Sequence, residues 1–233
     1  DYKNILMHGM RAALADGWGG SMIATDVQDV LFNSPQPIRS KVNLGVLKHD
    51  AVNILVHGHE PVLSEMLVAA SRDPEMLALA EKQGSKGINI AGICCTANEI
   101  LMRHGIPVAG NFLQQELAIV TGAVDLMVTD VQCVMPSVAS LANCFHTKLV
   151  TTSSKGRMPG VEHIAFQEES AFETAKAIVS RAVESYARRD PSKVNIPTSS
   201  ADLVAGFTTE SVFKFLGGRF RGTFRPLNDA IID

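Results

Sequence analysis

The sequence predicts an α/β fold, a doubly wound, mostly parallel sheet with flanking helices, preceded by a short helical segment. Two observations lead to this prediction. Short runs of apolar and β-branched residues recur along the middle of the chain, and the segments between them repeat apolar residues at spacings of three and four. Strands that alternate with helices in this way form parallel β-α-β units.

The elements are expected in the following order. The first 34 residues are predicted to be helices that the glycine-rich run at 17–20 interrupts. A long amphipathic helix is predicted over 170–188, because basic residues gather at its C-terminal end, where the helix dipole favours them. Proline, serine and threonine over 191–200 predict a loop, and short helices are expected after it. Strands are expected at 52–56, 88–93, 124–129, 148–152 and 161–166.

This pattern divides the chain into three expected parts. A helical lead-in covers 1–40, a sheet domain covers 41–190, and a helical extension covers 191–233. The chain opens at Asp1 without a methionine and ends two residues after the apolar Ile231. We therefore interpret the sequence as an excerpt from a longer polypeptide.

Composition narrows the class of protein. The 233 residues are 46% hydrophobic and 19% charged with a net charge of -3, which does not suggest a basic face for nucleic acid. No apolar run reaches the roughly 18 residues that span a bilayer, and no signal-peptide pattern opens the chain, so a cytoplasmic location is expected. Four cysteines without a small secreted framework are expected to be reduced and available for metal binding or packing.

Residues that can bind metals follow three of the expected strands. His57 and His59 follow the first, Cys94 and Cys95 follow the second, and Cys133 follows the third. The carboxyl ends of parallel strands share one edge of the sheet, and ligands bind in the crevice beside that edge. These side chains could therefore meet there although they are far apart in sequence.

The starts of the helices support this arrangement. Thr96 and Glu99 have the spacing of a capping box, which predicts Thr96 as an N-cap and places Cys95 just outside the helix. Pro61 and Pro136 favour the first turns of two other helices. Because the N-terminus of a helix favours anions, the pKa of a thiol at this place is expected to be lowered.

Other interpretations of the same residues stay open. Cys144 lies in a helical pattern and is expected to pack as a small apolar side chain, and Cys94 can pack while its neighbour faces the edge of the sheet. His57 could bind a metal or orient the histidine beside it. Known nucleotide, phosphate and thiol-exchange signatures are absent, since "GWGGSM" lacks the last glycine of the dinucleotide motif and no C-x-x-C occurs.

Four stretches of the sequence carry a family resemblance. "LADGWGGSMIATDVQDVLF", "VNILVHGHEPVLSE", "GINIAGICCTANEILMRHGIP" and "VDLMVTDVQCVMPS" together resemble the central part of the anaerobic, nickel-containing carbon monoxide dehydrogenases. The resemblance implies a Rossmann-like domain that helps to hold a Ni-Fe-S cluster. In this family, that cluster interconverts CO and water with CO2, two protons and two electrons.

The resemblance also implies roles for individual residues. His59 of the "HGH" motif and Cys95 of the "CC" doublet would bind the iron outside the cubane-like part of the cluster, and Cys133 of "DVQC" would bind an iron of the cage. Asp16 could support proton relay, although a helix-end carboxylate is the simpler interpretation. The remaining ligands and the further Fe-S clusters would come from parts of the protein outside this sequence, so the fragment alone is expected to be inactive.

The implied partners are an electron carrier such as ferredoxin, a second copy in a homodimer, and an acetyl-CoA synthase in some members. Two alternatives remain. The chain could be a noncatalytic α/β module that binds a small ligand or forms an interface, with its cysteines packed inside. It could also be an Fe-S oxidoreductase domain of the hybrid-cluster type, a class that uses glutamate ligands where this chain has cysteine.

Overall fold

The computed structural model describes residues 1–217, and residues 38–205 form a compact unit built on one eight-stranded sheet. The strand order is β7-β6-β5-β2-β3-β4-β1-β8. Every neighbouring pair is parallel except β1 and β8, which are antiparallel. The predicted fold class is therefore confirmed. The strands are β1 (Ile38–Val42), β2 (Val52–His57), β3 (Ile88–Ile93), β4 (Val108–Gly110), β5 (Leu126–Thr129), β6 (Lys148–Thr151), β7 (Glu162–His163) and β8 (Ala201–Ala205).

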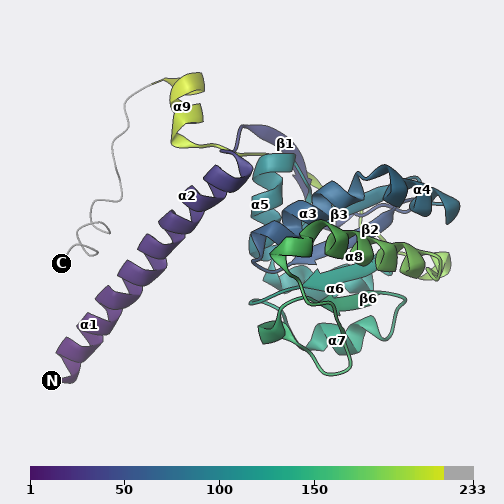
Figure 1. Ribbon diagram of the computed structural model, residues 1–233, viewed down its shortest axis with the longest axis horizontal. Helices are drawn as coiled ribbons and strands as arrows, with labels where there is room; N and C mark the ends of the chain where they lie inside the picture. The colour runs from purple at the N-terminus through teal and green to yellow at the C-terminus, as the bar shows by residue number, and fades with distance from the viewer. Residues whose placement is uncertain (218–233) are drawn as a thin grey trace. The chain divides into compact units, whose positions relative to one another are not determined.

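Helices cover both faces of this sheet (Figure 1). One apolar core joins the sheet to α3, α4, α5 and α8, and a second core on the other face joins it to α6 and α7. Val56 of β2 belongs to the first core and Leu55 to the second, as expected for side chains that alternate along a strand. The helices are α3 (Pro61–Ser71), α4 (Pro74–Lys82), α5 (Cys94–His104), α6 (Gln115–Val120), α7 (Ser137–Ala142) and α8 (Ala171–Tyr186).

Three strands were not predicted, for two physical reasons. β4 has only three residues, which is too short to show a period. β1 and β8 form a half-exposed pair, so their sequences carry polar residues instead of a continuous apolar run. The short helices expected after residue 200 are thus wrong over Ala201–Ala205, which is a strand. The expected domain boundaries at 41 and 190 stay predictions, and the part of the expected extension beyond residue 217 lies outside the described residues.

Among the described residues, the other unit contains residues 1–37 and 206–217. Its helices are α1 (Tyr2–Leu14), α2 (Gly20–Phe32) and α9 (Thr209–Leu216). A π-helical turn over Ala15–Gly19 connects α1 directly to α2, so the predicted interruption is wrong. Gly19 and Gly20 adopt ordinary helical dihedrals, and glycine lowers helix stability by only about 1 kcal/mol per residue.

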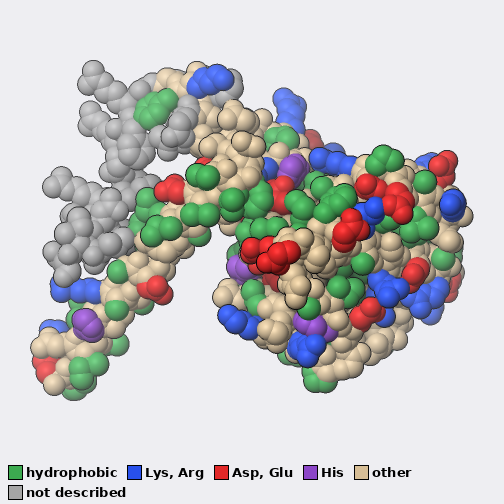
Figure 2. Space-filling model, in the orientation of Figure 1, with side chains coloured by type: hydrophobic (Ala, Val, Ile, Leu, Met, Phe, Trp, Pro, Cys, Tyr) green, Lys and Arg blue, Asp and Glu red, His purple; other side chains and the backbone are tan. Residues whose placement is uncertain are grey.

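The surface of the sheet unit carries charges of both signs, and acidic and basic side chains are interspersed on the face in Figure 2. Among the helices of residues 1–217, none is both long enough and apolar enough to cross a membrane.

Candidate metal centre

The carboxyl ends of three neighbouring strands define the candidate site. His57 at the end of β2 pairs with Ile93 at the end of β3 and with Thr129 at the end of β5. The segments that carry His59, Cys94, Cys95 and Cys133 therefore leave the sheet at one edge, called here the cluster edge. The predicted convergence of these three segments is confirmed at the level of the backbone.

A buried carboxylate fixes the turn that carries His59. Asp130 is 3% exposed, and its carboxylate accepts hydrogen bonds from the backbone N–H groups of His59 and Glu60, each at 2.7 Å. Gly58 makes this possible, because a Cβ atom on it would lie 1.6 Å from Asp130 Oδ1. Its φ of +152° is also one that L side chains rarely adopt. Neither Gly58 nor Asp130 was singled out in the sequence, although both lie inside the "HGH" and "DVQC" motifs.

A single hydrogen bond sets the orientation and tautomer of the His59 ring. Nδ1 lies 3.0 Å from the carbonyl oxygen of Val131. A carbonyl only accepts, so Nδ1 donates, and in the neutral ring the lone pair is on Nε2. Metal-binding histidines are commonly oriented by such a bond on the other ring nitrogen. The bond thus leaves the lone pair of the neutral His59 ring on Nε2, the nitrogen that a metal would bind.

The cysteine doublet opens α5 without a loop. Helix α5 begins at Cys94 and its N-cap is Ile93, so the prediction that Thr96 caps the helix is wrong. The N–H of Thr96 instead donates to Gly58 O at 2.9 Å, and Glu99 forms an ion pair with Arg103. The physical reason is that α5 begins at the residue after the end of β3, which leaves no room for a separate cap. Cys94, the first residue of the helix, has a φ of +63°.

The thiols of the doublet differ from the expectation in their acidity. Burial, followed by the negative charges of Cys133 and Cys95, raises the pKa of Cys94 to about 11. Burial and the charge of Cys133 also raise the pKa of Cys95. The predicted lowering by the helix dipole is therefore wrong for the metal-free chain. A bound cation would reverse this effect, because it favours thiolates over thiols.

The third segment places Cys133 beside the doublet. Gln132 and Cys133 both have positive φ values, 62° and 55°, in the loop that follows β5. The Cys133 side chain is exposed and lines a crevice of ≈ 250 Å³ with Lys155 and Met158. Since its charge acts on both thiols of the doublet, Cys133 lies close to them.

Residues 1–217 do not by themselves form a complete metal site. Within residues 1–217, no three His, Cys, Asp or Glu side chains stand close enough together to hold a metal ion. The assignment of His59, Cys95 and Cys133 as ligands stays a prediction. Asp16 lies exposed in the π-helical turn, and its role in proton relay also stays a prediction.

Comparison with known proteins decides the family. The sequence pattern of the Prismane/CO dehydrogenase family matches residues 1–232. The chain belongs to this family. It is 57% identical over 231 residues to carbon monoxide dehydrogenase 1 of Methanosarcina mazei, a match that covers 99% of this chain and 36% of that protein. The chain therefore spans about a third of the length of the curated relatives it matches.

Two solved structures agree with this family assignment. A nickel-free carbon monoxide dehydrogenase from Thermococcus sp. AM4 has a TM-score of 0.90 at 49% identity, covering 100% of this chain and 36% of that chain. An acetyl-CoA synthase/carbon monoxide dehydrogenase with NiZn[Fe4S4] and NiNi[Fe4S4] clusters has a TM-score of 0.80 at 48% identity, covering 84% of this chain and 29% of that chain.

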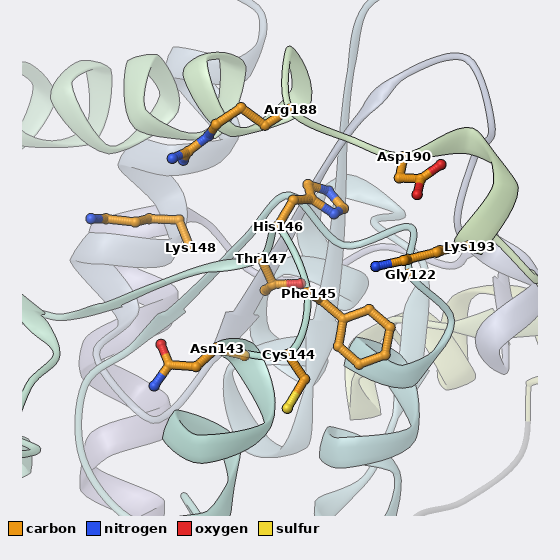
Figure 3. A pocket seen from close by; sticks show the side chains of 11 residues that line it. Gly122, Asn143, Cys144, Phe145, His146, Thr147, Lys148, Arg188, Asp190 and Lys193 are labelled. Carbon is orange, nitrogen blue, oxygen red and sulfur yellow. The ribbon is translucent and has the colours of Figure 1, made fainter.

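The sheet unit also contains a hollow of ≈ 490 Å³ (Figure 3). Its lining includes Cys144, His146 and Lys148, and Lys148 begins β6. The hollow is therefore at the amino ends of the strands, opposite the cluster edge. Cys144 is exposed there, so the expectation that it packs inside the protein is wrong.

Gly58→Ala is expected to lower the free energy of unfolding of the whole chain by about 1–3 kcal/mol from backbone strain alone, and further through the clash with Asp130. Chemical denaturation measures this loss. Gly87→Ala is the matched control, because Gly87 has a similar φ of +149° and no atom within 4 Å of the place that a Cβ atom would take. Equal losses in the two variants would show that the contact with Asp130 does not constrain Gly58.

Proposed function

We propose that this chain is the central, cluster-binding part of a carbon monoxide dehydrogenase, which oxidises CO with water to CO2, two protons and two electrons. The observation that carries the proposal is the cluster edge, where the motifs of His59, Cys95 and Cys133 leave three neighbouring parallel strands. Relatives that share about half of its residues are named carbon monoxide dehydrogenases, and one solved neighbour is described with nickel-containing [Fe4S4] clusters.

The residues present at the cluster edge fit such a cofactor. His59 offers an oriented Nε2, and Cys95 and Cys133 offer exposed thiols, which a bound metal would convert to the thiolates that suit iron-sulfur clusters. The negative charges of neighbouring thiolates repel each other, and a bound cation would offset this repulsion. When bound, a Ni-Fe-S cluster would supply the two-electron chemistry.

The chain's own contribution to the reaction is to hold and orient. Asp130 fixes the backbone at His59, and Val131 fixes the His59 ring. We further propose that Asp16 supports proton movement, that ferredoxin or a similar carrier accepts the electrons, and that the protein acts in the cytoplasm as a homodimer, in some settings with an acetyl-CoA synthase. One relative, 46% identical over 236 residues, is named carbon monoxide dehydrogenase/acetyl-CoA synthase subunit beta in Moorella thermoacetica, and this name supports the last of these proposals.

Metal analysis together with an activity assay tests the proposal. The intact protein that contains this chain, purified without oxygen, is expected to hold nickel and iron and to reduce a dye in a CO-dependent way. The 233-residue chain expressed alone is expected to hold little metal, because its described residues do not complete a site. An intact protein without nickel and iron would instead favour a noncatalytic α/β module.

A further inference from the structure

Gln115 occupies a central position beneath the cluster edge that the sequence did not reveal. It is the first residue of α6 and is fully buried. Every polar atom of its side chain is used. The Nε2 atom donates to the carbonyl oxygens of Phe112 at 2.8 Å and Cys133 at 3.1 Å. The Oε1 atom accepts from the N–H of Met135 at 2.9 Å and lies 3.2 Å from Nε2 of His57.

Two of these bonds enclose the loop that presents the Cys133 thiol. Gln132 and Cys133 are consecutive non-glycine residues in the left-handed region, a conformation that L side chains rarely adopt. The Gln115 amide binds the carbonyl of Cys133 on one side and the N–H of Met135 on the other. The side chain therefore gives two backbone groups of this loop a hydrogen-bond partner outside the loop. These two bonds favour the conformation with positive φ values.

The remaining bond connects the loop to the strand that leads to His59. Because both hydrogens of the Gln115 amide go to carbonyl oxygens, its Oε1 must accept, and Nε2 of His57 must donate. His57 is 1% exposed and is the last residue of β2, two positions before His59. One side chain on α6 thus contacts two of the three segments that carry candidate ligands.

We propose that Gln115 is a positioning residue of the metal centre, which fixes the direction of the Cys133 thiol relative to the end of β2. The inference rests on the proposed function for the identity of the metals, but not for the geometry of the loop. His57 contributes to the same positioning through its hydrogen bond to Gln115. The second ring nitrogen of His57, Nδ1, is buried without a hydrogen-bond partner in the described structure.

A merely structural role would predict only a loss of stability, so the test needs a matched variant. Gln115→Met keeps the volume of the side chain and removes all four bonds. Asn53→Leu is the control, because Asn53 is also fully buried and also makes four side-chain hydrogen bonds, but at the amino end of β2. Both variants are expected to be less stable than the wild-type protein.

Only Gln115→Met is expected to weaken metal binding. The intact protein of each variant is dialysed against a chelator. Gln115→Met is then expected to bind nickel and iron about 10-fold or more weakly than Asn53→Leu does, which is the range typical for loss of a bond that orients a ligand. Equal retention in the two variants would overturn the proposal. If Gln115→Met does not fold, Gln115→Glu serves in its place, because it keeps the shape and one acceptor but cannot donate to Cys133 O. Wild-type retention in Gln115→Glu would likewise overturn the proposal.

A second readout needs no metal. In chelated protein, the rate of alkylation of Cys133 relative to the exposed Cys144 is expected to rise on the order of threefold in Gln115→Met and to stay unchanged in Asn53→Leu, because only the former releases the loop. An unchanged ratio in both would contradict the positioning role. If the wild-type protein lacks nickel and iron while this ratio changes as expected, the proposed function fails and the positioning of Cys133 stands.

Discussion

Cys95→Ala is expected to lower CO-dependent dye reduction by the intact protein about 100-fold or more. Loss of a group that only orients a ligand costs up to about 100-fold, so loss of a ligand itself should cost at least as much. Cys94 does not offer an equivalent thiol, because it is half-buried and its pKa is raised to about 11. The iron content of the purified variant should fall together with the activity.

Cys144→Ala is the control for this prediction. Cys144 is an exposed cysteine like Cys95, but it lies by the hollow at the amino ends of the strands, and its thiol contacts only Ser140 O among the described hydrogen bonds. The control is expected to keep wild-type activity and iron content. Wild-type activity in Cys95→Ala would refute the role proposed for that residue.

The predictability of each strand from sequence follows its burial. β2 is buried at every residue and β3 at all but its first, so both appear as mostly apolar runs, and the observed β3 has the bounds predicted for it. β1 and β8 alternate between exposed and half-buried residues at the edge of the sheet. Their pairing depends on residues more than 150 positions apart, which a local pattern cannot contain.

The candidate site was predictable only in part, for a related reason. The order of the motifs along the chain was enough to place His59, Cys95 and Cys133 at one edge, because parallel strands align their carboxyl ends. The residues that support them act over long separations. Asp130 and His59 are 71 positions apart, and Gln115 and His57 are 58 apart. Only the folded chain shows these bonds.

The acidity of the thiols shows where a local argument fails. The helix dipole at the start of α5 was expected to lower the pKa of Cys95, and this effect concerns only one helix. In the folded chain, burial and the charge of Cys133, which comes from a different β-α unit, raise it instead. Burial is thus the stronger influence on the pKa of Cys95, and the charge of Cys133 adds to it.

A buried ion pair at the opposite edge leads to the largest expected effect on stability. The Asp125 carboxylate is fully buried and accepts from Arg189 Nε at 3.0 Å, with a second contact to the same guanidinium. It also accepts from the N–H of Asn53 at 2.6 Å and lies 2.8 Å from His146 Nε2. Arg189 follows α8, so this network joins the end of that helix to the starts of β2 and β5.

Asp125→Ala is expected to lower the free energy of unfolding by about 3–5 kcal/mol, because it leaves the buried Arg189 guanidinium without its counter-charge. For a chain of this size, the loss corresponds to a fall in Tm of roughly 6–20 °C. Asp202→Ala is the control, since Asp202 is 88% exposed and its ion pair with Lys41 should contribute less than about 1 kcal/mol. Calorimetry of the whole chain measures both.

A double variant separates the loss of a favourable interaction from the cost of an unpaired charge. If the unpaired guanidinium causes most of the loss, then Asp125→Leu with Arg189→Met should be more stable than Asp125→Leu alone, because an apolar pair can replace a buried ion pair at little cost. If the double variant is as unstable as the sum of the single ones, the bonds from Arg189 to the carbonyls of His49 and Ala51 matter independently of Asp125. Arg189 would then hold the turn before β2 by itself.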